Sequence, residues 1–155
     1  MKRALVLSAL VLAVGLASVA SAQTADDTIH LTRAVIQTER QAIVATNVGL
    51  SEAESAVFWP LYREYRSAVE QAIDTRVDML KRFSESYETL TDDEAMSLLD
   101  DHLSYQKQVL KVQTTYAKKM NKVLPGNTVA RLFQIENKMD AIINYELASD
   151  IPLIK

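Results

Sequence analysis

The chain of 155 residues has a formal net charge of −3, contains no Cys, and holds only three Gly and three Pro residues. The missing Cys excludes disulfides, Cys-ligated zinc, haem attachment through Cys-x-x-Cys-His and thiol catalysis. An acidic balance argues against nucleic acid as a partner, because the phosphate backbone requires a basic protein face. So few turn-forming residues indicate long helices with short connections.

The chain begins with a pattern typical of an export signal. A basic start (Lys2 and Arg3) precedes an almost unbroken apolar run over residues 4–17, and residues 20–22 are the small residues that a signal peptidase needs. We therefore expect residues 1–22 to be a cleaved signal peptide, with an uncleaved membrane anchor as the alternative. Cleavage removes both basic residues and no acid, which leaves 133 residues with 15 basic and 20 acidic side chains, a net charge of −5. The expected product is a periplasmic protein without stable membrane insertion.

The mature chain predicts two helices before its midpoint. Residues 23–27 are polar and without periodicity, so we expect a flexible tail there and a first helix from about Thr28 to Gly49. Ser51 then caps a second helix that runs to about Tyr87. The apolar stripe of this second helix steps by threes and fours through Phe58, Tyr62, Tyr65, Val69, Ile73, Val77, Leu80, Phe83 and Tyr87.

Two further helices follow. The third is expected from Asp92 to about Val123, and a fourth from Asn127 or Thr128 to about Ser149. The inward positions assigned to the third are Ala95, Leu99, His102, Gln106, Val109, Val112 or Gln113, Tyr116, Met120 and Val123. We therefore predict an all-α fold of four helices, short, long, long and short, in which the two long helices form an elongated antiparallel hairpin. Residues 28–155 are expected to form one domain.

Two groups of side chains stand out on these helices. Large aromatic residues concentrate early in the second helix, where they are either core or an interaction surface: Phe58, Trp59, Tyr62 and Tyr65. Two acids, Glu136 and Glu146, fall inside the apolar arc of the fourth helix. A buried carboxylate needs a cationic partner, so we predict that at least one of these acids forms an ion pair that fixes how the fourth helix docks. The candidate cations are Arg33, Arg40, Arg63 and Arg66.

The residues required for catalysis or for binding a cofactor are missing. The mature chain has only Gly49 and Gly126, so it lacks a phosphate-binding loop. His30 and His102 have no second His or Cys at a spacing that would ligate zinc. No ordered Ser, His and acid motif is present either. We expect neither an enzyme nor a protein with a cofactor or metal.

The most informative feature is a repeated helix-start signal. Leu50, Ser51 and Glu54 match Leu90, Thr91 and Glu94 at the same spacing, forty residues apart. In each copy the hydroxyl oxygen can accept from the backbone N–H three residues on, while the Glu carboxylate accepts from the N–H of the capping residue. Such a repeat predicts two consecutive long helices that begin in the same way.

This pair of motifs resembles the Leu-Thr-x-x-Gln elements of the Spy/CpxP-like periplasmic family. Ser51 replaces Thr in the first element, and Glu54 and Glu94 replace Gln, all with similar capping chemistry. The segments at 58–62 and 130–138 resemble an uncharacterised branch of that family. The resemblance implies a homodimer that holds unfolded or stressed envelope proteins without ATP. The alternative that it implies is a regulatory protein that docks on a specific envelope-stress sensor or another periplasmic partner.

Overall fold

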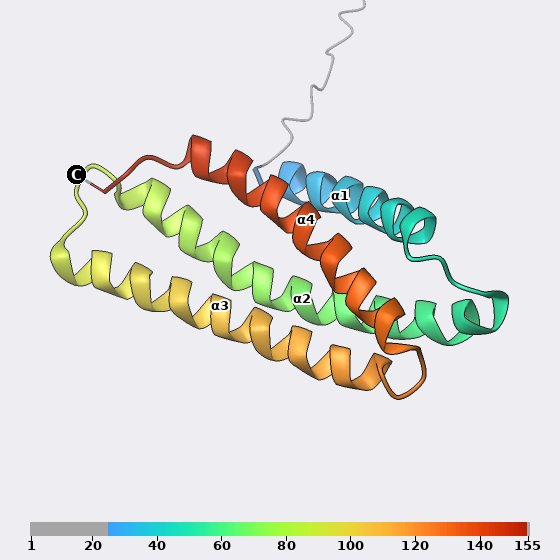
Figure 1. The fold of residues 1–155 in the computed structure, drawn as a ribbon. Helices are drawn as coiled ribbons and strands as arrows, with labels where there is room; N and C mark the ends of the chain where they lie inside the picture. Colours follow the sequence, from blue (N-terminus) through green and yellow to red (C-terminus); the bar gives the residue numbers. More distant parts are fainter. Residues whose placement is uncertain (1–24, 155) are drawn as a thin grey trace, which may run out of the picture. The chain divides into compact units, whose positions relative to one another are not determined.

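The computed structural model describes the backbone of residues 25–154, and the side chains of residues 34–154. Within this range the chain forms four α-helices and no strand (Figure 1): α1 Ala25–Asn47, α2 Glu52–Ser86, α3 Asp92–Met120 and α4 Gly126–Asp150. The predicted all-α fold, with long central helices and shorter flanking ones, is confirmed. The expected signal peptide, residues 1–22, lies outside the described residues.

The chain divides between Val35 and Ile36 into two compact units. The described part of the first unit is the helical segment 25–35. Residues 25–27, which we expected in a flexible tail, are therefore helical. The rest of α1 and the other three helices belong to the second unit, residues 36–155.

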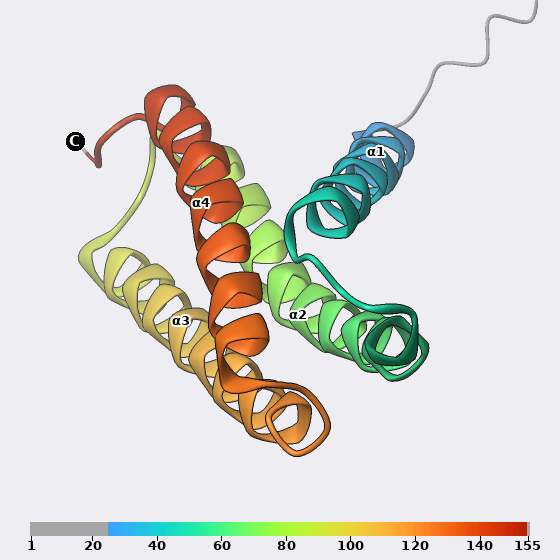
Figure 2. The ribbon, with the colours of Figure 1, turned by 45° about the vertical axis from the view of Figure 1, so that its right-hand side comes forward.

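In the second unit, α2 and α3 form the predicted antiparallel hairpin and lie side by side (Figures 1 and 2). Two ion pairs between α2 and α3 show that these helices run in opposite directions. Arg82, near the end of α2, pairs with Asp101, near the start of α3. Glu64, early in α2, lies 3.6 Å from Lys119, at the end of α3. The order of these contacts along each helix is the one that an antiparallel pair requires.

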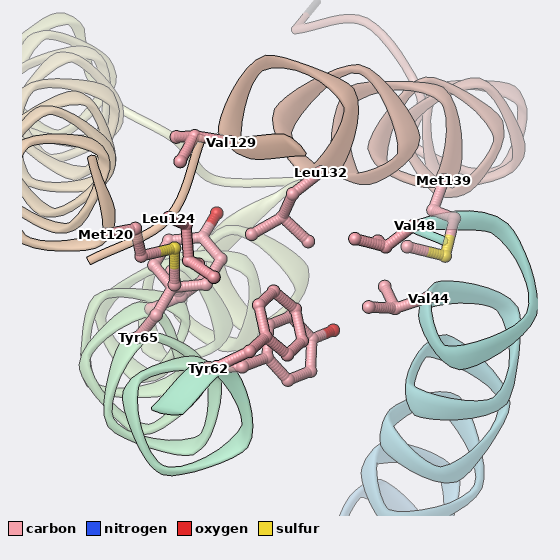
Figure 3. Close-up of a cluster of buried hydrophobic side chains, with 11 residues drawn as sticks. Val44, Val48, Tyr62, Tyr65, Met120, Leu124, Val129, Leu132 and Met139 are labelled. Atoms are coloured by element: carbon pink, nitrogen blue, oxygen red, sulfur yellow. The ribbon is translucent and has the colours of Figure 1, made fainter. Parts of the chain in front are cut away.

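The hydrophobic core lies at the end of the hairpin that is opposite its turn. Figure 3 shows buried side chains that converge there from α1, α2, α4 and the end of α3. They are Val44, Val48, Phe58, Tyr62, Tyr65, Val69, Met120, Leu124, Val129, Leu132 and Met139. We call this region the core end, and the hairpin from residue 73 to residue 105 the turn end. Burial of these apolar side chains is the main driving force that holds the helices together.

Most of the positions predicted to face inward on the third helix are buried or half-buried, but three of them, Leu99, Gln106 and Val123, are exposed. Leu99 and Val123 were assigned inward positions, but they are 47% and 51% exposed, while Leu98 is only 8% exposed. Val123 lies beyond the end of α3 at Met120, so the helical spacing no longer places it. Leu99 lies about 100° around the helix from Leu98, so the face that buries Leu98 leaves Leu99 at its outer edge.

Candidate functional site

Both helix-start motifs form complete capping boxes. At the start of α2, the Ser51 backbone N–H donates to the Glu54 carboxylate at 2.8 Å, and the Glu54 N–H donates to the Ser51 hydroxyl oxygen at 3.3 Å. Thr91 and Glu94 make the same two contacts at 2.9 and 3.3 Å. Hydrogen bonds from the Ser51 hydroxyl and then from its backbone N–H lower the pKa of Glu54, and those from the Thr91 backbone N–H and then from its hydroxyl lower the pKa of Glu94. The motifs therefore have a structural role at the beginning of each long helix.

The aromatic residues of α2 belong mainly to the core. Phe58, Tyr62 and Tyr65 are at most 3% exposed, and only Trp59 is half-buried. The Phe58 and Tyr62 rings stack with centroids 5.5 Å apart, and Tyr65 packs against Phe133 of α4 at the same distance. Of the two interpretations that the sequence left open, the structure supports a core role for the three buried rings.

One carboxylate, that of Glu136 on α4, is almost completely buried, with a side chain 1% exposed. It accepts from Arg40 of α1 at 2.9 Å, from Arg66 of α2 at 3.0 Å and from the Tyr62 hydroxyl at 2.7 Å. Three hydrogen bonds and two cations offset the cost of removing this charge from water. Glu136 therefore connects α4 to α1 and α2 within the second unit, as expected for an ion pair that fixes docking.

The surroundings of Glu136 extend this polar cluster. Asp140, one helical turn further along α4, also pairs with Arg40, and Glu70 lies 3.6 Å from Arg66. Burial alone would lower the pKa of Arg40, but Asp140 and Glu136 more than offset this and raise it above the usual value. Burial, followed by the nearby Glu136 charge, raises the pKa of Tyr62. Both groups therefore keep the protonated form in which they donate to a carboxylate.

The other predicted members of this cluster lie elsewhere. Glu146, which we expected on a buried face, is exposed, so that interpretation is wrong. It lies ten residues beyond Glu136, at the edge of the apolar arc of α4 where Ile142 is 61% exposed. Arg63 is exposed and forms no ion pair with Glu136. The side chain of Arg33 lies outside the described residues.

A further surface, not predicted from the sequence, runs along the outside of α3. It consists of four large apolar side chains that are between 42% and 63% exposed. We call it the α3 apolar stripe: Met96, Leu99, Leu103 and Leu110. At about 100° per residue these four positions fall within an arc of about 60°, and they extend over about 21 Å of helix. Met96, Leu99 and Leu103 are neighbours at helical spacing, Leu110 follows two turns beyond Leu103, and exposed apolar patches are typical of sites that interact with other molecules.

Neither a cluster of metal ligands nor a membrane-spanning helix is found among the described residues. No three His, Cys, Asp or Glu side chains among them gather in a way that would hold a metal ion. None of their helices contains a stretch long and apolar enough to span a bilayer. Comparison of the chain with protein-family models, curated proteins and solved structures finds no match. Function must therefore be inferred from the surfaces themselves.

Proposed function

We propose that this protein is an exported, periplasmic, ATP-independent chaperone-like protein that holds unfolded or stressed envelope proteins. The observation on which the proposal depends is the α3 apolar stripe. Four large apolar side chains on one helix face offer contact area to any chain segment that exposes hydrophobic residues. Met96 suits this role especially, because its unbranched thioether side chain adapts to differently shaped partners.

The repeated capping box supports assignment to the Spy/CpxP-like family as part of the same proposal. Its spacing of forty residues, from Ser51 to Thr91, matches two consecutive long helices that form a hairpin. The proposal includes a homodimer. Exposed apolar residues occur on α4 as well as on α3, with Ile142 at 61% and Tyr145 at 76%. One surface can be covered by a second copy while the other stays available to a client.

The test is suppression of aggregation by the mature protein. A chemically reduced, unfolding protein is mixed with stoichiometric amounts of wild type without nucleotide, and light scattering is followed over a range of salt. We expect suppression by wild type and loss of most of it in a triple variant with Leu99→Ser, Leu103→Ser and Leu110→Ser. The matched control is the double variant Ile142→Ser and Tyr145→Ser, which removes exposed apolar area from α4 instead. Circular dichroism verifies that both variants remain helical.

Two results would overturn the proposal. The first is no suppression by wild type at any salt concentration. The second is equal loss in the α3 and α4 variants, since the α3 apolar stripe would then have no special role. In-cell crosslinking tests the regulatory alternative: capture of one envelope protein in a saturable complex would favour docking on a specific sensor over general holding of clients.

A further inference from the structure

A groove of about 390 Å³ lies between the second half of α1 and α2, and no residue of α3 lines it. One wall presents Gln37 and Gln41, which are one turn apart on α1. The other wall presents Arg63, Arg66 and Ser67 of α2, followed by Glu70. Its volume is within the range of pockets that bind small molecules. Neither the chaperone proposal nor the α3 apolar stripe involves this groove.

The polar groups of the groove converge without satisfying one another. Gln37, Gln41, Arg63 and Ser67 form no side-chain hydrogen bond or ion pair with the residues that the structure describes. Each carries hydrogen-bond donors, and the two Gln side chains and Ser67 carry acceptors as well. All four side chains are exposed, so their donors and acceptors are accessible to a ligand in the groove. This convergence is the pattern of a ligand-binding pocket.

The charge of the groove sets the chemistry of its ligand. Its lining holds two Arg and one Glu, and Arg66 also pairs with the buried Glu136 carboxylate, so Arg63 is the cation of the lining without an ion-pair partner among the described residues. Arg66 is fixed in place, because one of its nitrogens donates to buried Glu136 at 3.0 Å and another lies 3.6 Å from Glu70. Arg63 is exposed and has no such partner. Its planar guanidinium is suited to bidentate contact with a carboxylate or a phosphate.

We propose that this groove binds a small molecule through an oxyanion, either a carboxylate or a phosphate. Arg63 makes the charged contact, while the charge of Arg66 is offset by Glu136 and Glu70, and Arg66 forms a fixed part of the groove wall. The amide groups of Gln37 and Gln41 and the hydroxyl of Ser67 complete the hydrogen bonding. The ring of Tyr62 contributes apolar area to the same groove. A fixed arginine lowers the ordering cost of binding, because its side chain does not need to be immobilised.

Isothermal titration calorimetry of the mature protein tests the proposal, with sodium phosphate and sodium succinate as separate probes at constant ionic strength. We expect at least one probe to bind saturably with a millimolar dissociation constant. Comparison of the phosphate and succinate titrations identifies the preferred oxyanion. Arg63→Gln should weaken binding about tenfold, and Arg63→Lys by less, since the charge remains but the bidentate geometry is lost. Arg131→Gln is the matched control, because Arg131 is an exposed arginine on α4 outside the groove.

Fluorescence gives a second measurement on the same samples. Trp59 is the single Trp of the chain, and its ring lies 5.7 Å from that of Tyr62. Binding in the groove should change its emission in wild type and in Arg131→Gln, with a reduced change in Arg63→Gln. Absence of saturable heat and of any emission change with both probes at tens of millimolar would overturn the proposal. So would equal weakening in Arg63→Gln and Arg131→Gln, or no weakening in Arg63→Gln.

Discussion

The two ends of the α2–α3 hairpin have the same kind of apolar stripe but bury it to different extents. At the core end, Phe58 and Tyr65 are 0% exposed. At the turn end, from residue 73 to residue 105, only Met79 and Leu98 are buried, and Phe83 is half-buried. The difference arises because α1, α4 and the chain after α3 also contribute side chains at the core end. Periodicity therefore tells which face of a helix is apolar, and the number of packed neighbours decides how deeply that face is buried.

Charged contacts differ between the ends in the same way. Glu136 and Arg40 at the core end have side chains 1% and 6% exposed, whereas Arg82 and Asp101 at the turn end are 52% and 36% exposed. Removing one partner of a buried ion pair costs several kcal/mol, while an exposed pair contributes at most about 1 kcal/mol. The core end thus depends on both its apolar and its charged side chains, and the turn end depends strongly on neither.

The largest expected effect compares two Phe residues of one stripe. Phe58→Ala should lower the free energy of unfolding by about 4 kcal/mol, because it leaves a cavity in the packed core. Phe83→Ala should cost about 1–2 kcal/mol, since this half-buried ring loses less contact and its site can fill with water. Urea denaturation of both variants measures the two values. Equal losses would show that the turn end is buried as deeply as the core end.

The next comparison concerns two acids of α4. Glu136→Gln should lower the free energy of unfolding by roughly 3 kcal/mol, because Arg40 and Arg66 then lack a buried counter-charge. Glu146→Gln should change it by less than about 0.5 kcal/mol, as expected for an exposed side chain. Thermal and urea unfolding of both variants provide the measurement. If Glu136→Gln lowers the free energy of unfolding no more than Glu146→Gln does, the polar cluster does not fix the docking of α4.

Local patterns in the sequence predicted the local structure well. The Ser51 and Thr91 motifs gave the starts of α2 and α3, and Gly49, with φ of 74°, occupies the left-handed conformation expected just after α1. A capping box needs only residues within one helical turn, so its sequence signal is complete. Because each long helix begins with a motif of this local kind, the succession of the two helices in the hairpin could also be predicted.

Features that depend on tertiary packing could be predicted only in part. Glu136 was singled out because a carboxylate in an apolar arc needs a partner, and the same reasoning applied to Glu146 was wrong. Both acids fall inside the apolar arc, about 80° apart on a helical wheel, and the sequence does not show which part of the arc α1 and α2 cover. The α3 apolar stripe was missed for a related reason: Leu98 and Leu99 are adjacent, and the sequence does not say which of them faces α2. The groove between α1 and α2 combines residues far apart in sequence, so no local signal marks it.

The smallest expected effect compares the two capping residues, one at each end of the hairpin. Ser51→Ala and Thr91→Ala should each lower the free energy of unfolding by about 1 kcal/mol, because each removes the same hydrogen-bond acceptor from a helix start. Amide hydrogen exchange should separate them. Loss of the Thr91 cap should increase exchange mainly in the first turn of α3, where few buried contacts oppose local opening. Loss of the Ser51 cap should be resisted locally, because Phe58 and Tyr62 hold the start of α2 in the core.

The pH dependence of the same variants tests the carboxylate half of each cap. Hydrogen bonds from Ser51 and Thr91 lower the pKa of Glu54 and Glu94 below the ordinary value of 4.5. A carboxyl with a lower pKa in the folded chain than in the unfolded chain stabilises the fold above the unfolded pKa, and this contribution is lost as the pH falls through the folded pKa. The difference in melting temperature between wild type and each capping variant should therefore be smaller at about pH 3 than at about pH 7. An equal difference at both pH values would mean that the hydroxyl stabilises the helix only as an acceptor, and that its contact with the carboxylate contributes nothing at either end of the hairpin.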